Sequence, residues 1–293
     1  MSTVHDAPPL TAESTRTYRR HVEEAATFFE EAAPVIPSLC LVLEAGLDGL
    51  GDAFDAQWTS SIGEVPHVPE VDDDTPRTLA VGTLGGTPVV VLDGSFPLHD
   101  GFTPRQVAFP IRMLADAGVE TVLFANTAGS VHPEVEPGDL FLVTDHVNFQ
   151  GTNPLVGPNV EEWGPRFPDM SEPYDPELRR EAERVALREG ISLQKGIYFA
   201  VLGPNLGTPA EYRMVRTLGG DVVGTGTVPE VIAARHMDRR VMTVSVITDR
   251  CSPDSTESTS TADMTAAVSS ARPRLRHLLE GVVGVLDGAD VPA

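Results

Sequence analysis

The sequence predicts a single α/β domain with a twisted, mostly parallel central sheet flanked by helices. Short apolar strands alternate with amphipathic helices along most of the 293 residues, a pattern typical of parallel sheets covered by helices. Several strand-like runs end in small or polar residues, as at the edge where such sheets bind ligands. There is no internal repeat and no linker between two halves. We therefore expect one domain over residues 13–290, preceded by a disordered segment, residues 1–12.

Composition excludes several classes of partner. The formal charge of −22 would be repelled by nucleic acid and by anionic membranes, so we expect neither as a partner. Cys40 and Cys251 cannot build a disulfide framework and are interpreted as buried or idle thiols of a reducing compartment. With no basic-plus-apolar leader and no membrane-length apolar run, the sequence predicts a cytoplasmic protein. No cluster has metal-ligand spacing, so no metal or cofactor is expected.

In the first part of the chain, periodicity and turn residues define the elements. Thr103 followed by Pro104 is a strong helix start, and Gly85-Gly86 supplies a hairpin turn. The expected elements are a helix at 14–33, a buried strand at 38–43, a loop over 59–76, hairpin strands at 79–84 and 88–92, and a helix at 103–117.

The remainder alternates more regularly between strand and helix. The strands are short apolar runs, and the helices begin at Pro-bearing or capped positions. We expect strands at 120–125, 139–144, 196–202, 221–224 and 241–248, with helices at 175–189, 209–218 and about 265–286.

The turn within Val223–His236 organises the rest of the chain. Thr227 and Glu230 have the spacing of a capping box, which predicts that a helix begins there. Gly224 and Gly226 allow the backbone to approach a ligand at the end of the preceding strand. The sequence therefore predicts a ligand crevice at this turn.

Several sequence blocks resemble the purine nucleoside phosphorylase family, in its trimeric branch. They occur in the family's order with similar gaps, over roughly residues 38 to 288. The resemblance implies one α/β domain and a homotrimer in which each site is completed by a neighbour. The blocks are Asn126-Thr-Ala-Gly129, Asp145-His-Val-Asn148, Arg166-Phe-Pro-Asp-Met-Ser171, Gly203-Pro-Asn205 and Gly224 through His236.

The phosphate-binding positions of that family are altered here. The serine after the first strand is replaced by Ala45, and the preceding position carries Glu44. The arginine and histidine of a second phosphate element are replaced by Ser95 and Pro97, and an unrelated acidic stretch at 73–77 replaces a histidine loop. Each lost charged hydrogen bond is worth about 1.5–3 kcal/mol. Phosphate is therefore a doubtful partner.

The positions that correspond to the base pocket also differ. Leu206 stands in place of a stacking aromatic residue, and Gly207 stands in place of the glutamate found in relatives that use 6-oxopurines. Asp249 stands where those relatives carry asparagine. The pair Gly207 and Asp249 resembles a 6-aminopurine pocket, in which a protonated Asp249 donates to the leaving N7. The alternative is that Asp249 only caps a loop.

The resemblance assigns further substrate-binding residues. The predicted anion and ribose contacts are Asn126, Thr127, Ala128 and Tyr198, and the predicted base and sugar contacts are Val223, Gly224, Thr225 and Asp263. Asp263 is equally consistent with a helix cap.

The sequence leaves three functions open. The first is hydrolysis of the N-glycosidic bond of a nucleoside, with Glu44 activating water in place of phosphate and Asp249 assisting the leaving base. The second is a phosphorylase whose anion site is rebuilt with Arg77 or Arg105. The third is a non-catalytic paralogue that binds a nucleoside-like metabolite.

Overall fold

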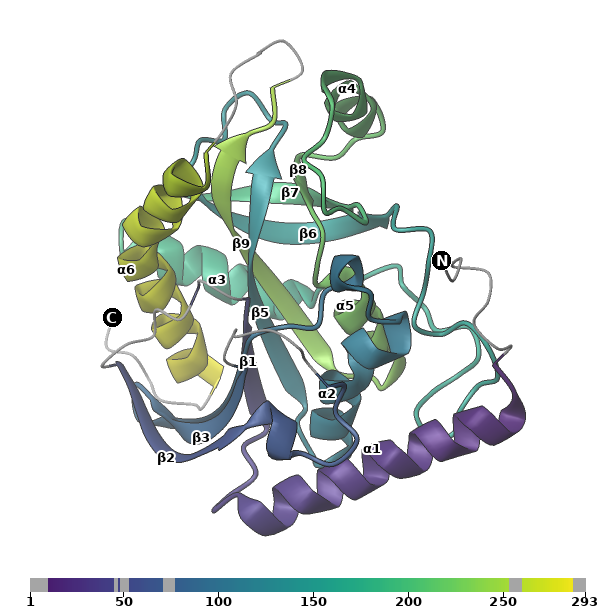
Figure 1. Ribbon diagram of the computed structural model, residues 1–293. Helices are drawn as coiled ribbons and strands as arrows, with labels where there is room; N and C mark the ends of the chain where they lie inside the picture. The colour runs from purple at the N-terminus through teal and green to yellow at the C-terminus, as the bar shows by residue number, and fades with distance from the viewer. Residues whose placement is uncertain (1–9, 45–46, 48–52, 71–76, 253–259, 287–293) are drawn as a thin grey trace.

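The computed structural model describes residues 10–44, 47, 53–70, 77–252 and 260–286. It is a single α/β domain, as predicted, built on a nine-stranded mixed sheet with helices on both faces (Figure 1). The strands are β1 (Leu39–Leu43), β2 (Phe54–Ser61), β3 (Thr78–Leu84), β4 (Thr87–Asp93), β5 (Thr121–Ser130), β6 (Leu140–Asn148), β7 (Leu193–Ala200), β8 (Val222–Gly224) and β9 (Arg240–Arg250). The helices are α1 (Ala12–Ala32), α2 (Pro104–Asp116), α3 (Pro176–Arg188), α4 (Pro209–Thr217), α5 (Val228–His236) and α6 (Thr261–Leu286).

The sheet has a parallel centre. β1 pairs in parallel with β4 and β5, and β5 pairs in parallel with β9. β2 and β3 extend one edge in antiparallel fashion. β5 also pairs with β8, so that β5, β8, β7, β6 and β9 form a closed ring of paired strands. Ring closure gathers the carboxyl ends of β5, β8 and β9 around one point.

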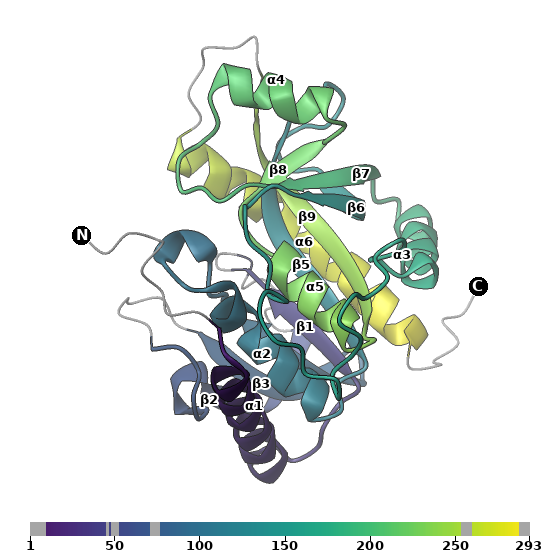
Figure 2. The same cartoon turned by 90° about the vertical axis from the view of Figure 1, so that its right-hand side faces the viewer.

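Two helical layers enclose the sheet. α3 and α6 pack together on one face, and α1, α2 and α5 cover the other (Figure 1). Strand β1 shows why both faces are apolar: Cys40 faces the core beneath α1 and α2, whereas the neighbouring Leu41 faces the core beneath α3 and α6. α4, which precedes β8 in the chain, lies apart from both layers (Figure 2). Several α4 residues reach the ends of the strands instead.

Some predicted boundaries were wrong. The loop predicted over 59–76 overlaps β2, which pairs with β3 through Trp58 opposite Val81. β2 is a sheet edge with mostly exposed side chains, so backbone hydrogen bonds define it and apolar periodicity does not. β5 continues five residues past the predicted end at 125, to Ser130, because β8 and β9 pair with its last residues.

The two ends of the chain are described only in part. Thr11 caps α1, which begins at Ala12. Residues 1–9 and 287–293 lie outside the described part, so the disorder predicted for the N-terminal segment stays a prediction. Within the described helices, none is long and apolar enough to cross a bilayer.

Candidate active site

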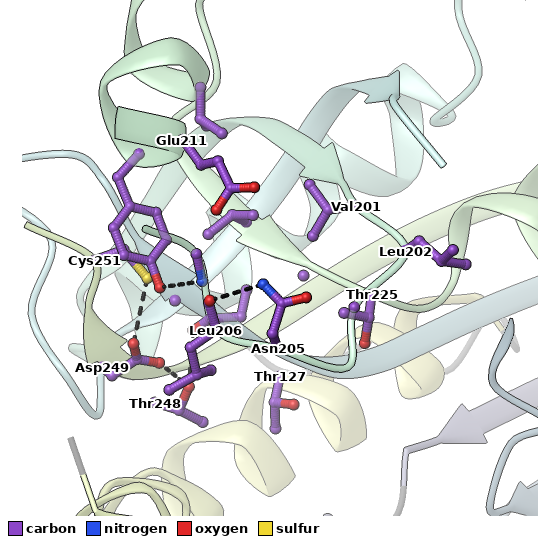
Figure 3. A pocket seen from close by; sticks show the side chains of 18 of the residues that line it. Thr127, Val201, Leu202, Asn205, Leu206, Glu211, Thr225, Thr248, Asp249 and Cys251 are labelled. Carbon is purple, nitrogen blue, oxygen red and sulfur yellow. Dashed lines mark hydrogen bonds between the residues drawn. The ribbon is translucent and has the colours of Figure 1, made fainter. Parts of the chain in front are cut away.

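A cavity of about 400 Å³ lies at the carboxyl ends of β1, β5, β8 and β9, with α4 above it (Figure 3). Strand ends in α/β sheets are the usual ligand crevice because side chains from several strands converge there. Most of the residues predicted from the sequence line this cavity. They are Glu44, Thr127, Ala128, Leu206, Gly207, Val223, Gly224, Thr225 and Asp249.

The Glu44 side chain is hydrogen-bonded to Thr127 in β5. Its Oε2 accepts hydrogen bonds from the backbone amide of Thr127 at 2.5 Å and from the Thr127 hydroxyl at 2.9 Å. The backbone amide of Glu44 donates to the carbonyl of Ala125 at 3.0 Å, which continues the β1–β5 ladder by one residue. The register of two strands thus places a carboxylate against an amide that faces the cavity.

The surroundings of Glu44 favour its protonated form. Burial raises the pKa of Glu44, while the two hydrogen bonds from Thr127 and the nearby His99 act in the opposite direction. The cavity is acidic elsewhere as well, since Glu211 and Asp249 also line it. Among the described residues that line the cavity there is no Lys, Arg or His. This lining offers a ligand dianion no countercharge.

The arginines considered for a rebuilt anion site lie elsewhere. Arg77 is buried against the ring of Phe96, and its Nε donates to the carbonyl of Ser95 at 2.7 Å. Arg105 packs over Tyr18 and donates to Thr15 at 3.2 Å. Neither side chain lines the cavity with Glu44.

Asn126 and Tyr198 lie beneath the cavity, outside its lining. Asn126 is 2% exposed and donates from Nδ2 to the Thr227 hydroxyl at 2.8 Å. Tyr198 is 1% exposed and packs directly under Gly224, where any side chain would collide with its hydroxyl. These two residues support the floor of the site in this structure, and direct sugar contact by either one stays a prediction.

The helix start predicted at Thr227 is present. The backbone amide of Thr227 donates to the Glu230 carboxylate at 3.1 Å, and Thr227 itself has a left-handed φ of 69°. Glu230 is 5% exposed. Burial, with a smaller contribution from the charge of Glu44, raises its pKa to about 8. The floor of the site thus holds a second carboxyl group that favours its neutral form.

Asp249 lies near the end of β9, which pairs with β5, as β1 does. Its Oδ1 accepts from the Thr248 hydroxyl at 2.7 Å, and its Oδ2 accepts from the Cys251 thiol at 3.2 Å (Figure 3). Asp249 is 6% exposed and lines the cavity. It pairs with Gly129 of β5, which also pairs with Val223 of β8. The strand ring therefore fixes the backbone of this end.

Tyr212 of α4 was missed by the sequence analysis. It lines the cavity, and its hydroxyl accepts from the backbone amide of Gly207 at 3.0 Å. A Cβ at Gly207 would stand 2.5 Å from the Tyr212 ring, so the ring occupies space that a larger residue at 207 would need. Tyr212 belongs to no sequence motif, so nothing in the sequence marks it as a site residue. Only the fold, which places its ring over Gly207, shows that it lines the cavity.

Asp263 lies outside the lining of the cavity. It accepts from the backbone amide of Ser260 at 3.2 Å and from its hydroxyl at 2.6 Å, which forms a cap at the start of α6. The next residue, Met264, lines the cavity instead. The structure thus matches the helix-cap alternative for Asp263, and a sugar contact by it stays a prediction.

Comparisons with known proteins show which family this chain resembles in sequence. Residues 48–284 match the model of the phosphorylase superfamily. Purine nucleoside phosphorylase 1 of Bacillus subtilis is 42% identical over 229 residues, which cover 78% of this chain and 84% of that protein. Purine nucleoside phosphorylase of Bos taurus is 41% identical over 221 residues, covering 73% and 76%.

Solved structures agree with the sequence relatives. A schistosoma purine nucleoside phosphorylase in complex with hypoxanthine superposes with a TM-score of 0.86 at 29% identity, covering 98% of this chain and all of that one (100%). The Schistosoma mansoni enzyme in complex with adenosine gives a TM-score of 0.86 at 30% identity, covering 94% and 98%. Fold and pocket thus define a member of the phosphorylase superfamily. Within it, the chain belongs to the purine nucleoside phosphorylase family.

Proposed function

We propose that this protein cleaves the N-glycosidic bond of a purine nucleoside. The observation that supports this most directly is the cavity at the strand ends, which gathers Glu44, Thr127, Thr225 and Asp249 from four separate segments of the chain. The relatives that share the fold and up to 42% of the sequence are named as purine nucleoside phosphorylases. Two reactants are candidates for the acceptor of the sugar.

Phosphate is the acceptor that the comparisons favour, because the named relatives are phosphorylases. In this chain, an incoming phosphate meets the carboxyl group of Glu44 at the Thr127 amide. The two are compatible when Glu44 is protonated, since a neutral carboxyl group donates a hydrogen bond to an anion. Burial raises the pKa of Glu44, in the direction that this reaction needs. Phosphorolysis should therefore be fastest at low pH.

Water is the acceptor that one local observation favours. The Glu44 carboxylate already accepts from the amide and hydroxyl of Thr127, so the protein supplies its own anion at that position. Ionised Glu44 would take a proton from water as the water oxygen bonds to C1′ and the C1′–N bond breaks. The bond's electron pair leaves with the base, whose ring nitrogen takes up a proton from solvent water, and Glu44 later returns its proton to solvent. Hydrolysis should therefore be fastest at high pH.

For the base, we propose a 6-aminopurine. Gly207 leaves no acceptor side chain at that position, and Asp249 presents a carboxylate to the cavity. A carboxylate attracts an exocyclic amino group and repels a carbonyl oxygen. The solved relatives are described as complexes with hypoxanthine and with adenosine, so the choice rests on this chain's own residues.

Product analysis at two pH values tests the proposal. Adenosine, 5′-methylthioadenosine and inosine are incubated at pH 5.5 and 8.5, with and without phosphate. Sugar 1-phosphate formed only with phosphate, and faster at pH 5.5, supports phosphorolysis. Free sugar formed without phosphate, and faster at pH 8.5, supports hydrolysis. Saturable binding without any product supports the non-catalytic paralogue and contradicts the proposed activity.

We also propose that the protein is a cytoplasmic homotrimer, as the family resemblance implies. Exposed large apolar side chains support an interface: Phe149, which lines the cavity, is 52% exposed, and Val156 and Phe167, which line a second cavity, are 57% and 86% exposed. Exposed apolar groups of this size commonly mark contact surfaces. The mass in solution, measured by light scattering, tests this; a monomer of 31.3 kDa contradicts it.

A further inference from the structure

A chain of contacts runs from the backbone of Gly207 to Asp249. The Gly207 amide donates to the Tyr212 hydroxyl at 3.0 Å. The Tyr212 side chain packs in the same small cluster as Cys251, and the Cys251 thiol donates to Asp249 Oδ2 at 3.2 Å. Cys251 is 3% exposed and packs with Tyr212 in the small core at this end of the sheet. Three separate segments of the protein are therefore joined at the base end of the cavity.

The two ends of this chain fix its direction. A backbone amide can only donate, and an ionised carboxylate can only accept. The Tyr212 hydroxyl therefore accepts from Gly207, and the Cys251 thiol donates to Asp249. Together with Thr248, which donates to Oδ1 at 2.7 Å, the chain holds Asp249 as a fixed hydrogen-bond acceptor.

Two glycines make room for this chain. The Tyr212 ring lies over Gly207, where a Cβ would come within 2.5 Å of the ring. A Cβ at Gly129 would collide with the Cys251 sulfur and would stand 3.1 Å from Asp249 Oδ1. A side chain at Gly207 would displace the Tyr212 ring, and a side chain at Gly129 would displace Cys251. The positions of Tyr212 and Cys251 thus depend on these two glycines.

We propose that Tyr212 and Cys251 are positioning residues that orient Asp249 and thereby select bases presenting a hydrogen-bond donor at that edge. The inference rests on the proposed function, because it assumes that a purine base occupies this end of the cavity. Each carboxylate oxygen of Asp249 accepts one protein hydrogen bond and retains a lone pair for the ligand. A 6-amino group fills that position, whereas a 6-oxo group is repelled.

This assignment differs from the idea that a protonated Asp249 donates to N7. The Thr248 hydroxyl and the Cys251 thiol each donate to one oxygen of Asp249, which places this side chain as a hydrogen-bond acceptor. Asp249 then accepts from the amino group or from a protonated ring nitrogen of the departing base. Asp249 would therefore act both in selecting the base and in its release.

The test measures binding of free adenine and free hypoxanthine by calorimetry, which requires no turnover. The variants are Tyr212→Phe, Cys251→Ala and Cys251→Ser, and the matched control is Cys40→Ala, a buried cysteine in β1. Loss of one hydrogen bond should lower the preference for adenine over hypoxanthine by about three- to tenfold in Tyr212→Phe and Cys251→Ala. Cys251→Ser keeps a donor and should retain the preference, as should Cys40→Ala.

Two results overturn the inference. One is an unchanged preference in Tyr212→Phe and Cys251→Ala variants that keep the wild-type melting temperature. The other is failure of the wild-type protein to bind either base. Turnover is measured separately: absence of product from any purine nucleoside contradicts the proposed function, and a preference for adenine that falls in both variants still supports the positioning role.

Discussion

The two ends of the cavity hold their acidic groups in different ways. At the anion end, Glu44 is held by the backbone amide and hydroxyl of one residue, Thr127. At the base end, Asp249 is held by the side chains of Thr248 and Cys251, one on each carboxylate oxygen. Glu44 directly follows β1 and Asp249 is the next-to-last residue of β9, yet only Asp249 has donors on both oxygens.

This difference suggests one role for each acid: proton transfer for Glu44 and recognition of the base for Asp249. Both hydrogen bonds to Glu44 fall on one oxygen, and burial raises its pKa. A group of this kind suits proton transfer. Asp249 is constrained on both sides and suits recognition. The anion end should therefore control the reaction rate and its pH dependence, and the base end should control which purine is accepted.

The largest effect is expected at the anion end. Glu44→Gln keeps the size and the acceptor oxygen but removes the titrating group, and loss of a general base typically costs about a hundred- to ten-thousandfold in rate. Phosphate-independent release of the base should fall by that amount. Glu211→Gln is the control, because Glu211 also lines the cavity but caps α4. Unchanged hydrolysis in Glu44→Gln would exclude the base role.

The same variant separates the two acceptors. If phosphate is the acceptor, Gln at position 44 still donates to it, so phosphorolysis should persist and lose its decline with rising pH. This follows because Glu44 must be protonated to admit phosphate, and that form is lost as pH rises through its raised pKa. Initial rates between pH 5 and 9, with and without phosphate, provide the measurement.

A smaller effect is expected at the base end. Asp249→Asn replaces one acceptor oxygen by an amide donor, so the preference should move from 6-amino toward 6-oxo bases. A hydrogen bond to a charged group is worth about 1.5–3 kcal/mol, which corresponds to a change of about ten- to a hundredfold in the ratio of kcat/KM for adenosine and inosine. Thr248→Val removes one supporting donor and should change the ratio less. A ratio that is equal in wild type and Asp249→Asn would remove Asp249 from base recognition.

Much of the fold could be predicted from the sequence, because strand and helix periods were clear in the buried parts. The α2 cap at Thr103 and the α4 start at Pro209 were found from local rules alone. β2 was missed because an exposed edge strand owes its form to pairing with β3. The extension of β5 was missed for a similar reason, since its last residues pair with β8 and β9, far along the chain.

Comparison of single residues with a family motif led to Glu44 and Asp249, and both line the cavity; their roles stay predictions. Residues were missed where a contact joins parts of the chain that are far apart in sequence. Tyr212 and Gly207 are five residues apart, and Cys251 is much further along the chain; only the fold brings the three together. Cys251 was interpreted as a buried or idle thiol, and it is buried, but nothing in the sequence indicated its acceptor, Asp249.

A modest effect is expected from Gly207→Ala, which tests the base end sterically. The new methyl group would stand 2.5 Å from the Tyr212 ring and must displace it, which weakens the support of Asp249. The preference for adenosine over inosine should fall by about three- to fivefold, equivalent to part of one hydrogen bond. Gly284→Ala in α6 is the control, because a Cβ there meets nothing within 4 Å. A full wild-type preference in Gly207→Ala would show that Tyr212 can move without consequence.

The smallest effect concerns stability, and it compares the capping glutamates near the two ends. Glu230 caps α5 close to Glu44 and is buried, with its pKa raised to about 8. Glu211 caps α4 at the exposed base end, where hydrogen bonds from Thr208 lower its pKa. Folded Glu230 holds a proton that the unfolded chain releases above the ordinary pKa of 4.5. Stability should therefore fall as pH rises from about 4.5 to about 8.

Glu230→Gln should flatten this decline, because the amide keeps an acceptor for the Thr227 backbone amide and does not titrate. We expect the wild-type melting temperature to drop by roughly 2–4 °C for each kcal/mol lost across this range, and the variant to drop by less than half as much. Glu211→Gln should leave the decline intact, since its own contribution disappears only as pH falls through its lowered pKa. Calorimetric scans at pH 5.5, 6.5, 7.5 and 8.5 make the comparison. Equal declines in wild type and Glu230→Gln would mean that Glu44 alone carries the titration of the buried floor.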